Sequence, residues 1–511
     1  MTEENIISKL ENLISLKELD DDNTKALIHE IEKLIDRRHR KALPVILKLS
    51  SHLERLGAPI TAYEILYKEA IARKKRNKKK EYFKLLYLAL KAMSMASFTP
   101  FVERLLLESI EEIKKNSDLS VFLPYYLTLD AFYHHIYMFS YEVAIVEYLT
   151  AKEFLNFIRD EEISELGLPS KRKMEFYITE NIIDLYFRLR DNMPEYRKEE
   201  MLSEAQKHLK NLDAKDEEEY IQAFLKRIEF HILSHNYKIA EELLNEGKNY
   251  ISAQNERSFK PCFKRLEARL LREQNKYYNA YSRFVDALQE SIYYGNNFLE
   301  KLILDDIFNL ISKMPARGQL FSSEGEVFLD SMLNLLRSKD FYLGVDHSHE
   351  VAQLSVHLTG EVEKITGKEI DLDSIYMAGL LHDIGKLYIP WFILTKPTSL
   401  RPIEWEVIQS HPLIGAQVAL KLGYPKVAEI IEGHHERIDG SGYPYGKKNL
   451  SLETQIVALA DLFQAAITPS RIYKKPKTKE EVLEEIKDYG GRKFDAVVVQ
   501  ALFNVVREGK G

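Results

Sequence analysis

The stretch "HHERIDGSGYP", from His434 to Pro444, joins two adjacent histidines and a glutamate to a turn-forming run with two glycines and a proline. Histidine and glutamate side chains are common metal ligands. Gly440 and Gly442 allow tight backbone turns at low steric cost, and Pro444 restricts the exit from the loop. The stretch therefore predicts part of a metal site joined to a rigid loop, and other segments must supply the remaining ligands.

Four further segments in the last third of the chain offer such ligands. An apolar run ends in the pair His382–Asp383 of "SIYMAGLLHDIGK", and "IVALADLFQAA" carries Asp461, where an unpaired buried carboxylate would be costly. The segments "DHSHEVAQLS" and "WEVIQSHPLIGAQVA" each add one histidine. The candidate ligands are His347, His382, Asp383, His411, His434, His435 and Asp461. Nitrogen and oxygen ligands without sulfur suit iron, manganese or zinc, and seven ligands exceed the four of one tetrahedral zinc, so two metals are predicted.

The order and spacing of these residues resemble the HD-GYP family, the branch of the HD phosphohydrolase superfamily that acts on cyclic di-GMP. The resemblance covers residues 326 to 511. It is carried by "HDIGKLYIPWFILTKPTSL" and by the glycine, tyrosine and proline at 442 to 444, which give the family its name. It implies an all-helical bundle with the metal site in its core.

The resemblance also implies roles for individual residues. The seven candidate ligands would hold two divalent ions, iron in the first place and manganese as the alternative. Asp383 would bridge the ions, and Asp383 and Lys386 would be the catalytic residues. A water between the ions would attack phosphorus, which opens cyclic di-GMP to linear pGpG, with GMP as the alternative end product. Substrate contacts would come from Lys386, Lys396, Arg437, Gly442, Tyr443, Pro444, Arg471 and Lys474.

Three departures from the family pattern keep alternatives open. Leu343 stands where some members carry a third-metal glutamate, which favours two metals, and the stretch before the first ligand is one residue longer than usual. After Asp461 the chain has Gln464 and Ala466 in place of the usual aspartate and leucine, and the expected arginine comes one position late, at Arg471. A receptor that binds cyclic di-GMP without turnover, and a hydrolase of another cyclic dinucleotide, are therefore the alternatives.

The chain before the last third has a helical pattern almost throughout, so the fold class is all-α. A large–small–large–small pattern at offsets 0, 3, 7 and 10 begins at Tyr141, Tyr237 and Tyr277 and resembles degenerate tetratricopeptide repeats. An irregular helical bundle is the alternative. The predicted domains are a repeat region at 1–320, which senses a signal, binds a protein partner or self-associates, and a phosphodiesterase domain at 326–511, which the repeats are expected to regulate or target. The pair His134–His135 is predicted to be structural, because no carboxylate was recognised at metal-binding spacing.

Composition excludes several classes of protein. The 511 residues are 45% hydrophobic and 30% charged with a net charge of −7, which is globular and lacks the basic field of a protein that binds nucleic-acid polymers. The single cysteine excludes a disulfide framework within the chain. No apolar run is long enough to span a membrane and the start is polar, so a cytoplasmic protein is expected.

Overall fold

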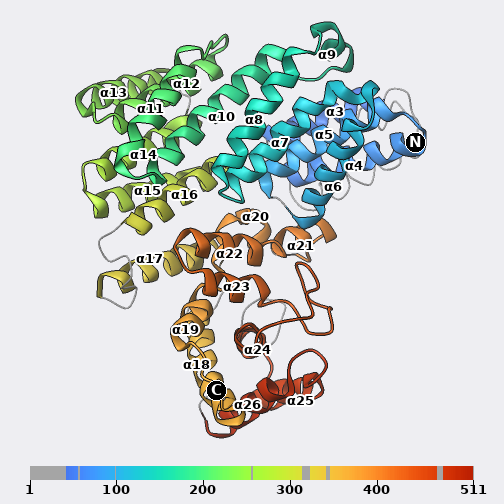
Figure 1. Cartoon of the computed structure of the whole chain (residues 1–511), viewed down its shortest axis with the longest axis vertical. Coiled ribbons are helices and arrows are strands. Elements are labelled where there is room, and N and C mark those ends of the chain that lie inside the picture. The colour runs from blue at the N-terminus through green and yellow to red at the C-terminus, as the bar shows by residue number, and fades with distance from the viewer. Residues whose placement is uncertain are drawn as a thin grey trace. The chain divides into compact units, whose positions relative to one another are not determined.

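The computed structural model describes residues 42–55, 58–97, 99–254, 257–313, 323–340, 346–396, 398–468 and 476–509. The contacts within the chain divide it into two compact units, Met1–Ile307 and Phe308–Gly511. In Figure 1 the colour runs along the chain from blue at the amino terminus to red at the carboxy terminus. The predicted domain boundary between 320 and 326 stays a prediction, and residues 320–322 lie outside the described ranges.

Both units are helical, and within the described ranges no strand occurs, which confirms the predicted all-α class. Among these residues no helix is both long and apolar enough to cross a lipid bilayer. The helices that begin in the first unit are α3 (Ala42–Arg55), α4 (Pro59–Lys75), α5 (Lys79–Ala96), α6 (Pro100–Lys114), α7 (Leu123–Ile136), α8 (Tyr141–Asn156), α9 (Asp160–Leu166), α10 (Lys171–Asn192), α11 (Glu195–Lys210), α12 (Glu217–Leu233), α13 (Tyr237–Gln254), α14 (Lys260–Glu273), α15 (Tyr277–Tyr293) and α16 (Asn297–Lys313), with 3₁₀ turns η1 (Ser117–Phe122) and η2 (Arg257–Phe259).

Five turns between consecutive helices of the first unit share one backbone conformation. In each, a residue in the left-handed region stands two positions before the next helix. These residues are Asn77 (φ 56°) before α5, Phe139 (52°) before α8, His235 (58°) before α13, Asn275 (62°) before α15 and Gly295 (66°) before α16. A left-handed residue closes a helix because it lets the following N–H groups reach the last free carbonyls. The recurring turn supports a repeated helix-pair unit, while the tetratricopeptide assignment stays a prediction.

The small residues of the repeat pattern lie where helices pack closely. Ala144, Ala240 and Ala280 are fully buried on α8, α13 and α15. A Cβ atom added to Gly247 of α13 would lie 2.2 Å from Cε1 of Phe263 on α14. Glycine is therefore required at this contact, because any side chain would push the two helices apart.

A buried network of ion pairs crosses the first unit. Arg269 on α14 is fully buried, pairs with Asp191 at 2.9 Å and contacts Glu229, and its nearest guanidinium nitrogen lies 3.5 Å from Asp306. Buried charges cost free energy unless opposite charges compensate them. The network therefore fixes how α10, α12, α14 and α16 pack, because each helix contributes one of its charges.

The second unit holds the predicted site. Its helices are α17 (Ser323–Lys339), α18 (His347–Thr366), α19 (Leu372–Leu381), α20 (Trp391–Leu394), α21 (Pro402–Ile408), α22 (His411–Lys421), α23 (Pro425–Gly433), α24 (Leu452–Ile467), α25 (Lys479–Ile486) and α26 (Ala496–Arg507), with 3₁₀ turns η3 (Ile384–Tyr388) and η4 (Lys487–Tyr489). α18 packs on α19, α24 and α26, and α22 packs on α23 and η3. A Cβ atom on Gly379 would lie 2.6 Å from Cα of Ala352, so α18 and α19 are in backbone contact.

Candidate metal centre

Five short segments of the second unit place the seven predicted ligands around one centre. Most of these side chains stand at helix ends, where the backbone changes direction. Three of them are at most 1% exposed, namely His382, His411 and His434. In chain order, His347 begins α18, His382 follows α19, Asp383 precedes η3, His411 begins α22, His434 and His435 follow α23, and Asp461 lies within α24.

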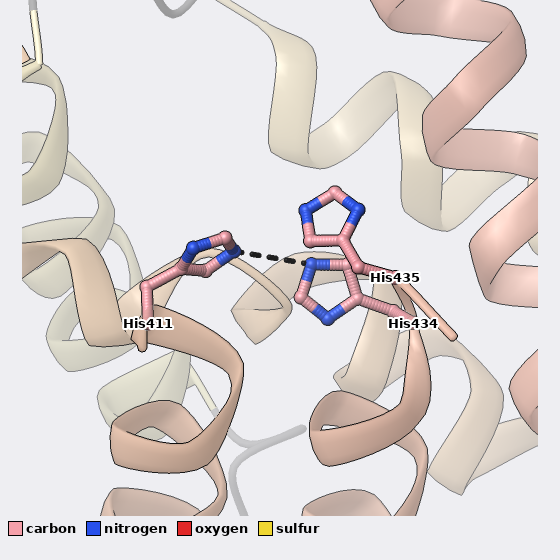
Figure 2. Close-up of side chains that lie close together, drawn as sticks. All are labelled: His411, His434 and His435. Carbon is pink, nitrogen blue, oxygen red and sulfur yellow. Dashed lines mark hydrogen bonds between the residues drawn. The ribbon is translucent and has the colours of Figure 1, made fainter. Parts of the chain in front are cut away.

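The ligand atoms form two groups of three. His347, His382 and Asp383 bring one nitrogen or oxygen each to within 4.8 Å of one another. A second group, made of three histidines, meets the same limit. In Figure 2 His411 comes from one helix and His434 and His435 from the end of another, and the Nε2 atoms of His411 and His434 are 3.3 Å apart.

The carboxylate of Asp383 connects the two groups. Its Oδ2 lies 3.3 Å from Nε2 of His382, and its Oδ1 lies 3.2 Å from Nε2 of His411. The two oxygens of one carboxylate thus face histidines of different groups. This is the arrangement that a bridging carboxylate needs.

Asp461 also reaches both groups, from α24. Its Oδ1 lies 3.3 Å from Nε2 of His347 and 3.5 Å from Nε2 of His382. Its Oδ2 lies 3.9 Å from Nδ1 of His435. The buried carboxylate on an apolar helix is therefore compensated by imidazoles, as the sequence led us to expect.

Three of the histidines are oriented by the backbone. Nδ1 of His382, His411 and His434 lies 2.8, 2.7 and 2.6 Å from the carbonyl oxygen three residues earlier in each case. A carbonyl only accepts, so Nδ1 carries the proton and Nε2 is directed at the centre. Hydrogen bonds of this kind fix the tautomer of metal-binding histidines.

Burial and neighbouring charges shift the pKa values of several of these groups. Burial raises the pKa of a carboxyl, but Lys386 and His382 outweigh it and hold the pKa of Asp383 well below its usual range. Burial lowers the pKa of His434 to about 3, and His411 and His382 act in the same direction. Burial would also lower the pKa of His382, but Asp383 and Asp461 raise it to about 10. At neutral pH the aspartate is ionised and His434 is neutral, while His382 has to exchange a proton for a metal.

Lys386 is part of the support for Asp383. Its ammonium group donates to Oδ2 of Asp383 at 2.8 Å and lies 3.5 Å from Oδ2 of Asp340. These two carboxylates hold the pKa of the lysine above its usual value, although burial opposes this. The lysine that is predicted to contact a phosphate is therefore paired with Asp383. Asp340 was not recognised from the sequence, because it precedes the predicted domain motifs without any pattern of its own.

The loop after His435 folds back onto the ligand segment. A Cβ atom on Gly442 would lie 2.4 Å from Cα of Glu436 and 2.5 Å from the carbonyl oxygen of His435, so only glycine fits. The ring of Tyr443 lies 4.5 Å from that of His435, centroid to centroid. The glycine and the tyrosine of the family motif thus shape the wall beside one ligand.

Glu436 anchors this loop and was missed in the sequence. It is fully buried and accepts hydrogen bonds from the backbone N–H groups of Tyr445 at 2.7 Å and Lys447 at 3.0 Å. The glutamate of "HHER" therefore binds the loop, while the predicted ligands are its neighbours. A buried carboxylate beside a glycine-rich run was the available signal, since such a run presents backbone donors.

Two further side chains that are predicted to contact the substrate already have partners within the protein. Lys396 is buried and donates to Oε2 of Glu404 at 2.8 Å. Arg437 donates to the carbonyl oxygens of His434 at 3.1 Å and Glu436 at 2.6 Å, with its guanidinium over the ring of Phe494. Pro444 follows Tyr443 in the loop and is partly exposed. Arg471 and Lys474, like Leu343, lie outside the described residues.

The side chains present fit a pair of divalent metal ions. Nε2 of His382 is buried without a hydrogen-bond partner and is directed at the centre. Two ionised aspartates and a set of backbone-oriented imidazoles supply nitrogen and oxygen donors of the kind that iron, manganese and zinc accept. Each aspartate also touches both histidine groups, which suits two ions better than one.

Comparisons with known proteins agree with this geometry. Residues 343–498 match the family described as HD domain, which confirms the predicted HD domain in the last third of the chain. HD-domain phosphohydrolases are metal dependent. The match does not include the first unit, so its repeat assignment gains no support from it.

Three curated relatives resemble part of this chain. A cyclic di-GMP phosphodiesterase of Thermotoga maritima is 34% identical over 236 residues, which are 44% of this chain and 62% of that protein. A 3′3′-cGAMP-specific phosphodiesterase of Vibrio cholerae is 37% identical over 156 residues, 30% of this chain and 35% of that protein. A cyclic di-GMP phosphodiesterase of Pseudomonas aeruginosa is 34% identical over 183 residues, 35% and 43% of the two chains. The chain thus spans between a third and three fifths of these relatives.

Proposed function

We propose that the second unit is a metal-dependent phosphodiesterase that hydrolyses cyclic di-GMP to linear pGpG and then to GMP. Two divalent ions, iron in the first place and manganese as the alternative, would be held by His347, His382, Asp383, His411, His434, His435 and Asp461. The observation that carries the proposal is the position of Asp383, whose two oxygens face histidines of different groups at 3.3 and 3.2 Å. The HD-domain match and the activities named for the relatives support it.

The metal ions would supply Lewis acidity, which lowers the pKa of water and neutralises charge on the phosphoryl oxygens. The protein's own groups prepare the site for this chemistry. Lys386 keeps Asp383 ionised and holds one of its oxygens, so the carboxylate cannot rotate away from the two histidines. Asp340 in turn orients Lys386, and we expect its loss to affect the site through that lysine.

The loop would form one wall of the substrate site. Tyr443 lies against the ring of His435 and within 6.4 Å of the ring of Trp405, centroid to centroid, and the tryptophan is 45% exposed. Exposed aromatic rings next to a phosphate-cleaving centre suit nucleobases, because any base can stack on a ring. Glu436 keeps this wall in place through the loop backbone.

Hydrolysis by the metal-loaded protein tests the proposal. Protein purified without oxygen and loaded with iron or manganese should convert cyclic di-GMP to pGpG and GMP, measured by liquid chromatography. Asp383→Ala should lose both bound metal and product formation, whereas His357→Ala, an exposed histidine of α18, should keep them. Normal metal content and turnover in the Asp383 variant would refute the assignment.

Two other functions differ in what the same assay would detect. Tight binding of cyclic di-GMP without product would make the second unit a receptor. Faster turnover of 3′3′-cGAMP in a competition assay would change the substrate, and the resemblance to a 3′3′-cGAMP-specific enzyme motivates this arm. The cytoplasmic location and the protein partner or self-association of the first unit stay predictions from the sequence.

A further inference from the structure

We propose that the first unit holds a divalent metal ion of its own, bound by Asp130 and His134 of α7 and Glu147 of α8. The site is separate from the predicted centre of the second unit, since all three residues lie in Met1–Ile307. It is an alternative to the structural role that the sequence predicts for His134, since two carboxylates do lie near this histidine. Asp130 is one helical turn before the histidine, and Glu147 comes from the next helix.

The geometry brings three ligand atoms to one point. Asp130, His134 and Glu147 each offer an atom within 4.8 Å of the other two. Nε2 of His134 lies 3.7 Å from Oε1 of Glu147, which is too long for a hydrogen bond and near the separation of two ligand atoms that share one metal ion. Residues four apart project from the same face of a helix, so Asp130 and His134 meet the neighbouring helix together.

The chemistry of the cluster calls for a positive partner. Asp130 is 8% exposed, and Oε2 of Glu147 is buried without a hydrogen-bond partner. Burial raises the pKa of Asp130, and burial together with the neighbouring Asp130 raises the pKa of Glu147 to about 8. The carboxyls of buried Asp130 and half-buried Glu147 face each other, and two such groups are stabilised either by a proton shared between them or by a cation.

The surroundings of the cluster are acidic on the side of α6 as well. Burial raises the pKa of Glu103 on α6, and Asp130 adds to this increase. The charge of Lys114 lowers the pKa of Asp130, but the ammonium group of this lysine is exposed and pairs with Glu111 at 3.3 Å. A divalent ion would compensate the carboxylates more directly than this surface lysine does.

The donor set points to a class of ion. One imidazole nitrogen and two carboxylate oxygens suit Zn²⁺, Mn²⁺ or Fe²⁺. The side chains of His134 and Glu147 are 27% and 19% exposed, so the ion could enter from solvent and complete its coordination with water. A bound ion would fasten α7 to α8 and stabilise the first unit, because it binds the folded state.

Metal counting in the full chain tests this site without relying on catalysis. The double variant Asp383→Ala/His434→Ala disables the predicted centre of the second unit and serves as background. After chelation, this protein is titrated with Zn²⁺ by calorimetry and its metal content is measured by mass spectrometry. We expect one bound ion per chain, and no bound ion at saturating Zn²⁺ would overturn the proposal.

Variants of the cluster decide where that ion binds. Changes to outer-shell groups already weaken metal affinity by about 10–100-fold, so His134→Ala and Glu147→Gln should weaken it at least about 100-fold. Glu142→Gln, an exposed glutamate of α8, should bind as the background does. Unchanged binding in both cluster variants would place the ion elsewhere and refute the proposal, and circular dichroism at 222 nm checks that each variant is folded. Failure of the phosphodiesterase assay leaves these outcomes unaffected.

Discussion

Replacing Gly385 by alanine tests whether the candidate centre depends on backbone contact between η3 and α22. A Cβ atom at this position would lie 2.0 Å from the carbonyl oxygen of His411 and 2.6 Å from the backbone nitrogen of Gly415. Both neighbours are backbone atoms, which cannot rotate away as a side-chain end does. The two segments must therefore separate.

The required movement follows from the distances. Ordinary contacts of a Cβ atom begin at 3.4 Å, so the oxygen at 2.0 Å has to move by about 1.4 Å. Asp383 precedes η3 and His411 begins α22, so the same movement widens the 3.2 Å contact between them. Overpacking of a core costs about 1–3 kcal/mol, and widening the centre should also reduce metal affinity.

Thermal unfolding, metal content and hydrolysis of the full chain measure these effects. We expect Gly385→Ala to melt at a lower temperature, to bind less metal and to lose turnover of cyclic di-GMP. Gly360→Ala is the matched control, since among the described residues no atom beyond the adjoining backbone of α18 lies within 4 Å of its added Cβ, and it should gain about 0.5–1 kcal/mol from helix propensity. If Gly385→Ala retains wild-type melting, metal content and turnover, the rigid contact between η3 and α22 is not needed and the reasoning fails.

Three further changes probe the loop, the cluster in the first unit and the buried network. Glu436→Gln places an amide N–H₂ group next to backbone N–H groups that need an acceptor, and it should destabilise the loop by about 1–3 kcal/mol. We expect a higher KM at unchanged metal content, and an unchanged KM would contradict this role of Glu436. With metal removed by a chelator, the raised pKa of Glu147 means that the folded state binds more protons than the unfolded state from about pH 4.5 to 8, so the free energy of unfolding falls as pH rises across that range. Glu147→Gln should remove this pH dependence of the free energy of unfolding, measured by urea titrations, and an equal pH dependence in the variant would refute the prediction. Arg269→Met leaves buried carboxylates uncompensated and should cost about 3–5 kcal/mol, against less than about 0.5 kcal/mol for the partly exposed Arg283→Met; equal losses in urea unfolding would contradict the network.

The helical class and the group of ligand-type residues could be predicted from the sequence because both depend on local patterns. The spacing of apolar residues predicts the helices, and the pair His382–Asp383 can be recognised from its position at the end of an apolar run. The partners of these residues could not be found in this way. Asp340, which supports Lys386, and Glu404, which pairs with Lys396, become neighbours only through the tertiary packing.

The cluster in the first unit shows the same limit from the other side. Asp130 and His134 stand four residues apart in "DAFYHH", which is a spacing that places both on one helix face. The run is rich in aromatic residues and reads as core, and Glu147 joins it only because α8 folds back on α7. A two-residue pattern that needs a third ligand from another helix cannot be separated from ordinary core residues by sequence alone.

The positions of the cations indicate how a phosphate would be bound in the second unit. Lys386 is paired with Asp383, Lys396 with Glu404, and Arg437 with two backbone carbonyls. Each would have to give up an existing partner to bind a phosphate, and a buried carboxylate left behind costs free energy. We therefore infer that these three side chains contribute little to balancing a phosphoryl charge and that metal ions would balance it instead, so that metal removal should abolish substrate binding as well as turnover. Calorimetry with cyclic di-GMP and chelated protein measures this directly, and retained affinity would show that the side-chain cations suffice.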